Sequence, residues 1–319
     1  MKLFTKFLAH VEMMRPYTLF HSGMLAFAAA LFLSEGEAEP WRLALAFLVP
    51  TLGWLAGLYA GDYYDRDLDA LAKPHRPVPS GRVGAQEAFG FMVCYISVGY
   101  VLALVLSPLA LFIAVLTTVF GIAYSKTFKR RAILGNLDRG LLACFTVLFA
   151  SAAVGSLEVG WPLLLLLGIF FFHDGSSNLI GALRDLEGDR VAGCPTVPVV
   201  YGIPRSIRIS GMLTLAWLAL ALPLFGYYQD REVSLALFAV ALLMTGLAYF
   251  MLLAHQERLT REQALGAHKV VVIERLVLSA AVGALHGPVL LVLLLLVVAI
   301  AATQITQTLL RNRYEFTSV

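Results

Sequence analysis

The chain alternates long apolar stretches with short polar loops over nearly its whole length. We predict about nine membrane-spanning helices, because a helix needs roughly 20 apolar residues to cross a bilayer. The predicted spans are Tyr17–Ser34, Leu43–Ala60, Ala85–Leu106, Leu109–Tyr124, Leu141–Val154, Trp161–Phe172 with a more polar continuation, Ile209–Gly226, Leu235–Leu253 and Pro288–Ile305. The pattern therefore predicts an all-α, polytopic membrane protein.

Two segments differ from these spans. His268–Leu285 is largely apolar but carries Glu274 and Arg275 in its middle, so we expect an interfacial or half-buried helix, with a tenth span as the alternative. Residues 1–16 place their apolar side chains on one rough helical face, which predicts an amphipathic helix at the membrane interface. Their basic character resembles a secretory signal, but we interpret this leader as uncleaved because further spans follow.

Composition excludes a soluble enzyme. Of 319 residues, 59% are hydrophobic and only 14% are charged, against roughly 25% charged in soluble domains. The polar intervals are too short for a separate domain, so we predict one membrane domain over residues 1–319. The net charge of +3 is spread over many loops and does not indicate nucleic-acid binding. The three cysteines show no pairing pattern, and we expect no disulfide.

The basic residues predict the orientation of the chain. With nine spans and a cytoplasmic amino terminus, only Arg42, Arg231, Arg311 and Arg313 of the 24 Lys and Arg fall outside. This asymmetry agrees with the positive-inside rule. The longer polar loops lie on the cytoplasmic side, where we expect a polar cap over the helices and the functional site.

Two rows of aspartates occupy that side, each at the end of a span. Asp62, Asp65 and Asp69 stand at i, i+3 and i+7, so a continuing helix places them on one face; Asp185 and Asp189 stand at i and i+4. Carboxylates packed this closely require compensating positive charge. Because Mg²⁺ favours hard oxygen ligands and phosphate oxygens, the two rows are suited to hold a diphosphate through bridging ions. We therefore predict these five aspartates as metal ligands and catalytic residues.

Basic and polar residues of the same region extend the predicted site. Five bases of the inside loops are suited to neutralise a terminal phosphate, which Arg does with a bidentate fork: Arg76, Arg82, Lys126, Arg130 and Arg184. Asn178 lies two helical turns before Asp185 and shares its face. The histidines show no zinc-binding spacing.

These motifs resemble the UbiA superfamily of intramembrane prenyltransferases. The segment GDYYDRDLDALAKPHRPVPSGRV resembles the family's first aspartate motif with its Arg-Pro-x-Pro-Ser-Gly continuation, and GALRDLEGDRVAGCPTVPVVYG resembles its second. Tyr124 and Ser125 in YSKTFKR look like the family's Tyr-Ser pair, which implies hydrogen bonds to the diphosphate or the acceptor. One departure is Gly61, which stands where the family has a metal-assisting asparagine. The resemblance implies a central cavity with a polar cap and an opening toward lipid.

The predicted reaction is a Mg²⁺-dependent transfer of a prenyl group from an isoprenoid diphosphate to a small acceptor, either an aromatic ring, a quinone precursor or another lipid. The ions and bases stabilise the leaving diphosphate, and a sheltered nucleophile captures the allylic cation. Two alternatives stay open. A terpene cyclase would use the same ionisation, and a lipid-diphosphate carrier would bind the headgroup without chemistry.

Overall fold

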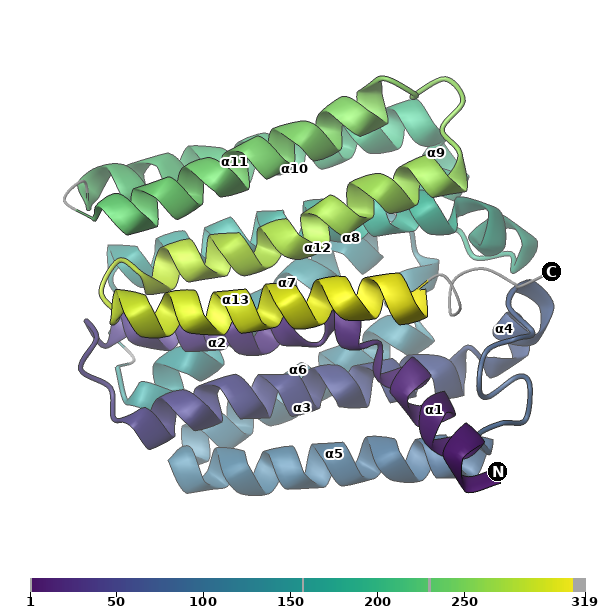
Figure 1. Cartoon of the computed structure of the whole chain (residues 1–319), viewed down its shortest axis with the longest axis horizontal. Helices are drawn as coiled ribbons and strands as arrows, with labels where there is room; N and C mark the ends of the chain where they lie inside the picture. The colour runs from purple at the N-terminus through teal and green to yellow at the C-terminus, as the bar shows by residue number, and fades with distance from the viewer. Residues whose placement is uncertain (1, 157, 229–230, 312–319) are drawn as a thin grey trace.

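A bundle of long antiparallel helices forms the computed structural model of the chain, in which residues 2–156, 158–228 and 231–311 are described (Figure 1). Within these ranges there are helices and no strands. The elements are α1 (Lys2–Met14), η1 (Pro16–Thr18), α2 (Phe20–Leu33), α3 (Pro40–Tyr64), α4 (Arg66–Ala72), α5 (Ala85–Leu106), α6 (Pro108–Lys126), η2 (Phe128–Arg130), α7 (Ile133–Val154), α8 (Trp161–Val191), α9 (Val197–Tyr201), α10 (Ile203–Tyr227), α11 (Glu232–Leu253), α12 (Arg261–Gly283), α13 (Val289–Thr306) and η3 (Gln307–Arg311).

The predicted all-α, multi-pass membrane architecture is confirmed. In the described chain, eight helices are long and apolar enough to cross a bilayer, and the count is nine if the bent pair Phe4–Thr18 and Phe20–Leu33 is taken as one span. The largest difference in bounds is α8, which continues beyond the predicted apolar end at Phe172 to Val191. This polar continuation is helical because its inner face is buried within the bundle, where neighbouring helices supply its partners.

The prediction of an interfacial helix at His268–Leu285 is wrong. Helix α12 lies inside the bundle, packed against α2, α8, α11 and α13, and both Glu274 and Arg275 are buried. Its 23 residues extend about 34 Å, which is enough to cross the bilayer. The two charges are tolerated because each has a partner on α8. Polar groups inside membranes usually face the bundle interior in this way.

Because α12 runs along the length of the bundle, α13 ends at the same end of the bundle as the aspartate motifs. Arg311 lies at the end of the bundle that carries the aspartate motifs, where its guanidinium donates to His268, so the nine-span prediction that placed it at the opposite end is wrong. Arg313 lies outside the described residues. In the described chain, the Lys and Arg at the opposite end of the bundle are then Arg42, in the first turn of α3, whose last turn carries Asp62, and Arg231, which precedes α11.

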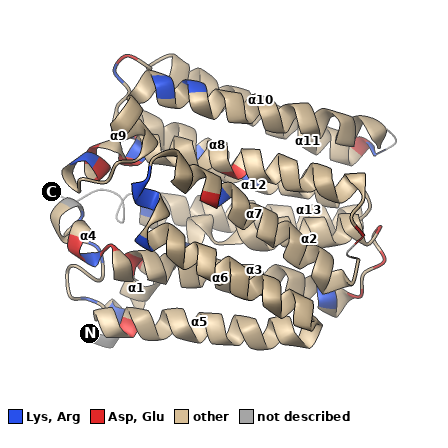
Figure 2. Cartoon of the chain, turned by 180° about the vertical axis from the view of Figure 1, so that it is seen from behind, with Lys and Arg blue, Asp and Glu red and all other residues tan. Residues whose placement is uncertain are grey.

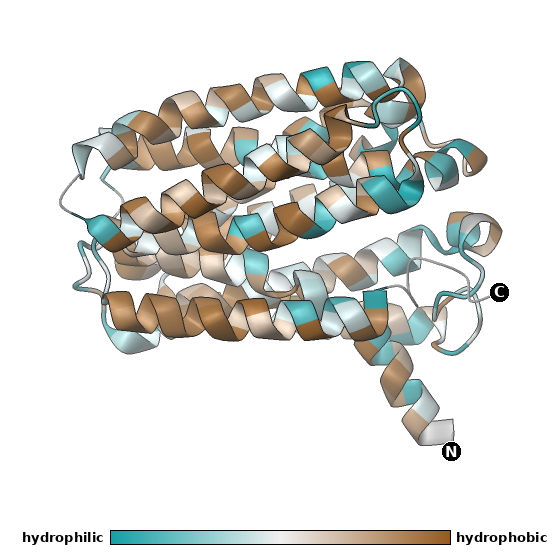
Figure 3. Ribbon diagram, turned by 45° about the horizontal axis from the view of Figure 1, so that its top comes forward, coloured by the Kyte–Doolittle hydropathy of each residue, from teal (hydrophilic) through white to brown (hydrophobic). Residues whose placement is uncertain are grey.

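Polar structure gathers at one end of the bundle. Figure 2 shows Lys, Arg, Asp and Glu concentrated around α4 and α9, and Figure 3 shows mostly apolar ribbon along the remaining length of the helices. Close helix packing holds this frame together: a Cβ at Gly140 of α7 would lie 2.5 Å from the Phe171 carbonyl oxygen of α8. Small residues allow such approach between spans.

Helix α1 leaves the bundle at an angle, and the bend between it and α2 is 44°. Phe4 and Phe7 are exposed on it, while Ala9 and Met13 pack against Tyr59 of α3. This arrangement leaves an apolar strip free for lipid headgroups or acyl chains. The interfacial position of residues 1–16 stays a prediction.

Candidate active site

The first aspartate row is built where α3 ends and α4 begins. The predicted continuous helix is interrupted at Asp65, the residue between α3 and α4, whose φ of −91° and ψ of 4° are not helical. Despite this break, Asp62, Asp65 and Asp69 are all buried and line one cavity of about 430 Å³. The sequence spacing therefore places the carboxylates together although the helix does not run through.

The second row lies on α8 and lines the same cavity. Asp185 and Asp189 line the same cavity as the first row, and Lys73, four residues after Asp69, donates from Nζ to Asp185 Oδ1 at 3.2 Å. Asp189 accepts a hydrogen bond of 3.1 Å from the Thr196 hydroxyl. Two motifs far apart in sequence thus meet at the mouth of one cavity.

Each aspartate of the first row has a basic partner from a different segment. Asp62 Oδ1 lies 2.5 Å from an Arg15 guanidinium nitrogen, Asp65 Oδ2 lies 2.7 Å from Lys129 Nζ, and Asp69 Oδ2 lies 2.8 Å from Arg76 Nη1. On the second row, Arg184 donates to Asp185 at 2.5 Å. These contacts supply the compensating charge that closely packed carboxylates require.

Three of these bases were not among the predicted site residues: Arg15, Lys73 and Lys129. Arg15 has a φ of 41°, an uncommon left-handed backbone for a residue other than Gly, in the bend between α1 and α2. Lys129 sits in η2, within the YSKTFKR motif that pointed to its neighbours. Burial opposes the charge of its ammonium, but Asp65 and Asp189 outweigh burial and raise the pKa of Lys129 above its ordinary value.

Three predicted bases do not line the cavity. The Arg82 guanidinium lies 2.7 Å from Glu12 and also donates to the His75 carbonyl oxygen, which holds it under α1. Lys126 Nζ lies over the Tyr64 ring. Arg130 is at the rim, half-exposed, 3.7 Å from Asp65 Oδ1. Arg76 and Arg184 do line the cavity.

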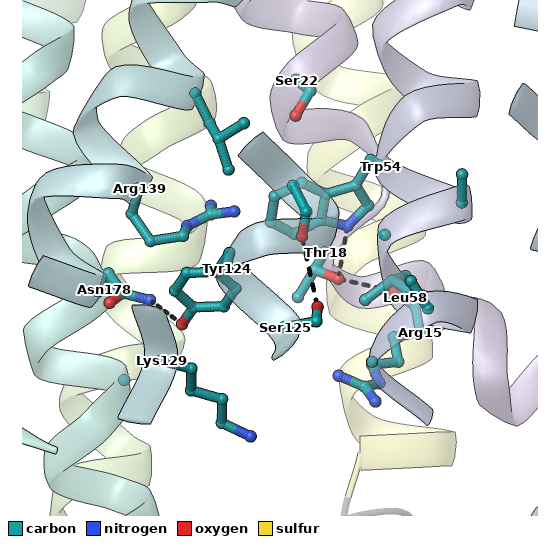
Figure 4. A pocket seen from close by; sticks show the side chains of 18 of the residues that line it. Arg15, Thr18, Ser22, Trp54, Leu58, Tyr124, Ser125, Lys129, Arg139 and Asn178 are labelled. Atoms are coloured by element: carbon teal, nitrogen blue, oxygen red, sulfur yellow. Dashed lines mark hydrogen bonds between the residues drawn. The ribbon is translucent and has the colours of Figure 1, made fainter. Parts of the chain in front are cut away.

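The predicted polar residues of the spans lie one layer deeper. Tyr124, Ser125 and Asn178 line the cavity, and Asn178 Nδ2 donates to the Tyr124 hydroxyl at 3.3 Å (Figure 4). Asn136 of α7 in turn donates to Asn178 Oδ1 at 3.0 Å. This chain of hydrogen bonds fixes the tyrosine ring between the charged mouth and the interior of the bundle.

The donor set of the mouth consists of carboxylate oxygens. Within the described residues, no three His, Cys, Asp or Glu side chains form a group that would hold one ion by themselves. Asp65 Oδ1 is buried and has no hydrogen-bond partner there. The arrangement can therefore offer single carboxylates to an ion that takes its other ligands from water and phosphate, which is how proteins usually bind Mg²⁺.

Comparison with known proteins gives consistent results. The model of the UbiA prenyltransferase family matches residues 23–272. Digeranylgeranylglyceryl phosphate synthase of Natronomonas pharaonis is 33% identical over 222 residues, which cover 68% of this chain and 79% of that protein. The same enzyme of Korarchaeum cryptofilum is 30% identical over 216 residues, which cover 67% and 75% of the two chains.

Solved structures share the fold. A structure of digeranylgeranylglyceryl phosphate synthase superposes with a TM-score of 0.64 at 24% identity and covers 88% of this chain and 99% of that one. A UbiA homologue from Archaeoglobus fulgidus bound to GPP and Mg²⁺ superposes with a TM-score of 0.60 at 16% identity, covering 94% and 99%. At these identities the structural likeness concerns the arrangement of helices.

Proposed function

The chain belongs to the UbiA prenyltransferase family, and we propose that it transfers a prenyl group from an isoprenoid diphosphate to the hydroxyl group of a glycerophosphate lipid. The observation that carries the proposal is the meeting of two aspartate rows around one cavity, where Lys73, which follows the first row in sequence, is ion-paired with Asp185 of the second. The relatives named above support a lipid acceptor that bears a phosphate. Of the acceptors that the sequence leaves open, a lipid is therefore favoured.

The mouth of the cavity fits Mg²⁺. Its donors are hard carboxylate oxygens on two facing elements, and Asp65 presents a buried oxygen without a hydrogen bond. Ions bound there would hold the diphosphate and neutralise the negative charge that develops as the allylic carbon–oxygen bond breaks. We propose Asp62, Asp65, Asp69, Asp185 and Asp189 as the residues that hold them. The comparison with a Mg²⁺-bound and GPP-bound neighbour supports this.

The chain's own bases would bind the remaining charge of the diphosphate. Lys129 and Arg76 line the cavity beside the first row, and Arg184 lies beside the second. When a diphosphate enters, its oxygens compete with the carboxylates for these cations, and preorganised cations stabilise the leaving group without further rearrangement. Arg82, Lys126 and Arg130 do not line the cavity, so they would contribute positive charge from behind its wall without contacting the diphosphate.

The interior of the cavity would hold the tail and exclude water. Beyond the mouth its walls carry Leu25, Val49 and Phe149, so an isoprenoid chain can lie against apolar side chains. The ring of Tyr124, held by Asn178, would lie beside the allylic carbon, where aromatic faces stabilise positive charge. Exclusion of water favours capture of the cation by the acceptor over hydrolysis.

We also propose that the mouth faces the cytoplasm. Apart from Arg42 and Arg231, the Lys and Arg of the described helix ends and loops lie at the end of the bundle that carries the mouth. Positive loops are retained on the cytoplasmic side during insertion. Protease protection of tagged termini in oriented vesicles tests this orientation.

Reconstitution tests the reaction. The purified protein in lipid vesicles is incubated with geranylgeranyl diphosphate, Mg²⁺ and geranylgeranylglyceryl phosphate, and the lipid product is identified by mass spectrometry. We expect a product that carries a second geranylgeranyl chain. A cyclic hydrocarbon formed without acceptor would instead support the cyclase, and tight binding without any release of diphosphate would support the carrier.

A further inference from the structure

A second polar layer lies deeper in the cavity than the aspartate mouth. Four residues form it: His21 of α2, Arg139 of α7, Asp174 of α8 and Arg275 of α12. Arg139 is partly buried, the other three are buried, and all four line the cavity. Asp174 precedes Asp185 by three helical turns on the same helix, so the layer lies roughly 16 Å along α8 from the second aspartate row. The layer is therefore separate from the mouth.

One carboxylate holds this layer together. Asp174 Oδ2 lies 3.1 Å from an Arg139 guanidinium nitrogen, and Asp174 Oδ1 lies 3.4 Å from His21 Nε2 and also accepts a hydrogen bond from Arg275. The acid next to Arg275 is already engaged, because Glu274 pairs with His173 at 2.8 Å. Asp138, next to Arg139, is buried but does not line the cavity. Two guanidinium groups and an imidazole thus share one carboxylate.

The layer has more hydrogen-bond donors than acceptors. Within the described chain, the N–H donors Arg139 Nε and Arg275 Nε are buried without a hydrogen-bond partner; His21 Nδ1 and Asp174 Oδ2, the oxygen that is ion-paired with Arg139, are also buried without one. Buried donors of this kind cost free energy unless a partner satisfies them, and buried charges cost still more. An anionic group in the cavity would satisfy both requirements. The geometry therefore indicates an anion site.

Arg139 is the member of the layer best placed to meet a ligand. Its guanidinium lies 5.0 Å from the centre of the Trp54 ring and 5.8 Å from that of Tyr124, which holds the planar group open to the cavity. Figure 4 shows it beside Tyr124, on the side away from Lys129. A guanidinium binds two oxygens of a phosphate or carboxylate at once.

We propose that this layer binds the phosphate of the acceptor lipid, with Arg139 as its principal contact. The inference rests on the proposed function, since it assigns the acceptor to a place in the same cavity. The diphosphate at the mouth and the acceptor phosphate at Arg139 would then lie on opposite sides of the reacting carbon and hydroxyl. Keeping the two anions apart also limits their repulsion in a medium of low dielectric constant.

The test compares two acceptors in two proteins. Wild type and Arg139→Gln are assayed in vesicles with geranylgeranyl diphosphate and either geranylgeranylglyceryl phosphate or the uncharged geranylgeranylglycerol. We expect the substitution to raise the KM for the phosphate acceptor roughly 30-fold or more, the usual effect of losing one partner of a buried charge pair. The KM for the uncharged acceptor and for geranylgeranyl diphosphate should stay within about twofold of the wild type.

Two further variants keep the test sharp. Arg139→Lys retains the charge without the fork and should fall between wild type and Arg139→Gln. Arg231→Gln, at the opposite end of the bundle, should match the wild type with both acceptors. Because Asp174 keeps His21 and Arg275 in Arg139→Gln, we expect the variant to fold, and an unchanged KM for geranylgeranyl diphosphate verifies this.

Binding without turnover separates the two proposals. Quenching of Trp54 fluorescence by geranylgeranylglyceryl phosphate, with Trp54→Phe as the reference, reports the site even when no diphosphate is supplied. Arg139-dependent quenching without any product would overturn the proposed function and keep the anion site. Normal turnover with an unchanged acceptor preference in Arg139→Gln, or an equal loss for both acceptors, would overturn the anion site.

Discussion

Replacing Asp65 by Asn tests the aspartate mouth with the smallest change of shape. The amide has nearly the volume of the carboxylate and still accepts a hydrogen bond from Lys129, now 2.7 Å from Asp65 Oδ2. The bases left behind are partly solvated, since the side chains of Lys129 and Arg130 are 32% and 42% exposed. Although Asp65 itself is buried, these two bases reach water and keep much of their hydration when the carboxylate is neutralised, so the cost lies in the range of about 0–1 kcal/mol found for exposed ion pairs and below that of a fully buried pair. We therefore expect the folded protein to lose no more than about 1 kcal/mol.

The same substitution should cost far more in turnover. Asp65 is buried at the mouth, with 7% of its surface exposed. Of its two carboxylate oxygens, Oδ1 has no hydrogen-bond partner in the described chain. Removing one preorganised group that stabilises transition-state charge lowers rates roughly 100- to 1000-fold. This range corresponds to about 3–4 kcal/mol of activation free energy. Asp65→Asn should therefore raise the activation free energy of turnover much more than it lowers the free energy of unfolding.

Asp67→Asn is the matched control, because Asp67 lies two residues away and its side chain is 88% exposed. Both variants are reconstituted in vesicles, prenyl transfer is measured at several Mg²⁺ concentrations, and thermal stability is followed in detergent. We expect Asp67→Asn to retain wild-type rates. If Asp65→Asn kept a third or more of the wild-type rate at every Mg²⁺ concentration, or if both variants were equally impaired, Asp65 would not have the role assigned to it.

Three further outcomes follow from the site. Chelation by EDTA should abolish turnover and Mg²⁺ should restore it, while the thermal stability changes little because the aspartates are already paired with Lys and Arg; a large loss of stability on chelation would contradict this. Gly61→Asn should fold normally, since a Cβ at Gly61 meets no atom within 4 Å, and should lower the Mg²⁺ concentration that gives half-maximal rate. An inactive, unfolded variant would show that position 61 has no room for a side chain. Burial and, after it, Asp189 raise the pKa of the Cys194 thiol to about 11, so about one molecule in a thousand carries the thiolate at pH 8. With Cys94 and Cys144 replaced by Ser, iodoacetamide should therefore label Cys194 slowly at pH 8, and rapid labelling of the folded protein would refute this.

The spans and the aspartate rows are predictable from the sequence because both depend on local pattern. Apolar length alone identifies a membrane helix, since every backbone group of such a helix is satisfied within it. Each row stands at the end of a span, and an even number of spans separates the two rows in the sequence. Asp65 and Asp185 are therefore predicted on the same side of the membrane before any contact is known. Lys73 and Lys129 are harder to select, because the positive-inside bias places many bases on that face.

Helix α12 shows where local pattern fails. Glu274 and Arg275 in the middle of an apolar segment indicate an interface when that segment is considered alone. On α8, however, His173 and Asp174 interrupt another apolar run in the same way, and the structure pairs the two interruptions residue by residue. Partners 101 residues apart remove the electrostatic cost that the single-segment pattern suggests. Matching interruptions between two apolar segments is the signal that would have predicted a buried α12.

Arg311 is another buried charge that local pattern misplaces, and it lies beyond the family match, which ends at residue 272. Arg311 in η3 is fully buried: its guanidinium donates to Gln307 at 2.9 Å and to His268 Nδ1 at 2.5 Å, and it lies over the Tyr17 ring. A buried guanidinium requires such partners, and they come from η1, α12 and η3. His268 itself lines the cavity, so the contact between Arg311 and His268 joins the last helix to the wall of the site. Hydropathy alone would place the Arg311 guanidinium in water.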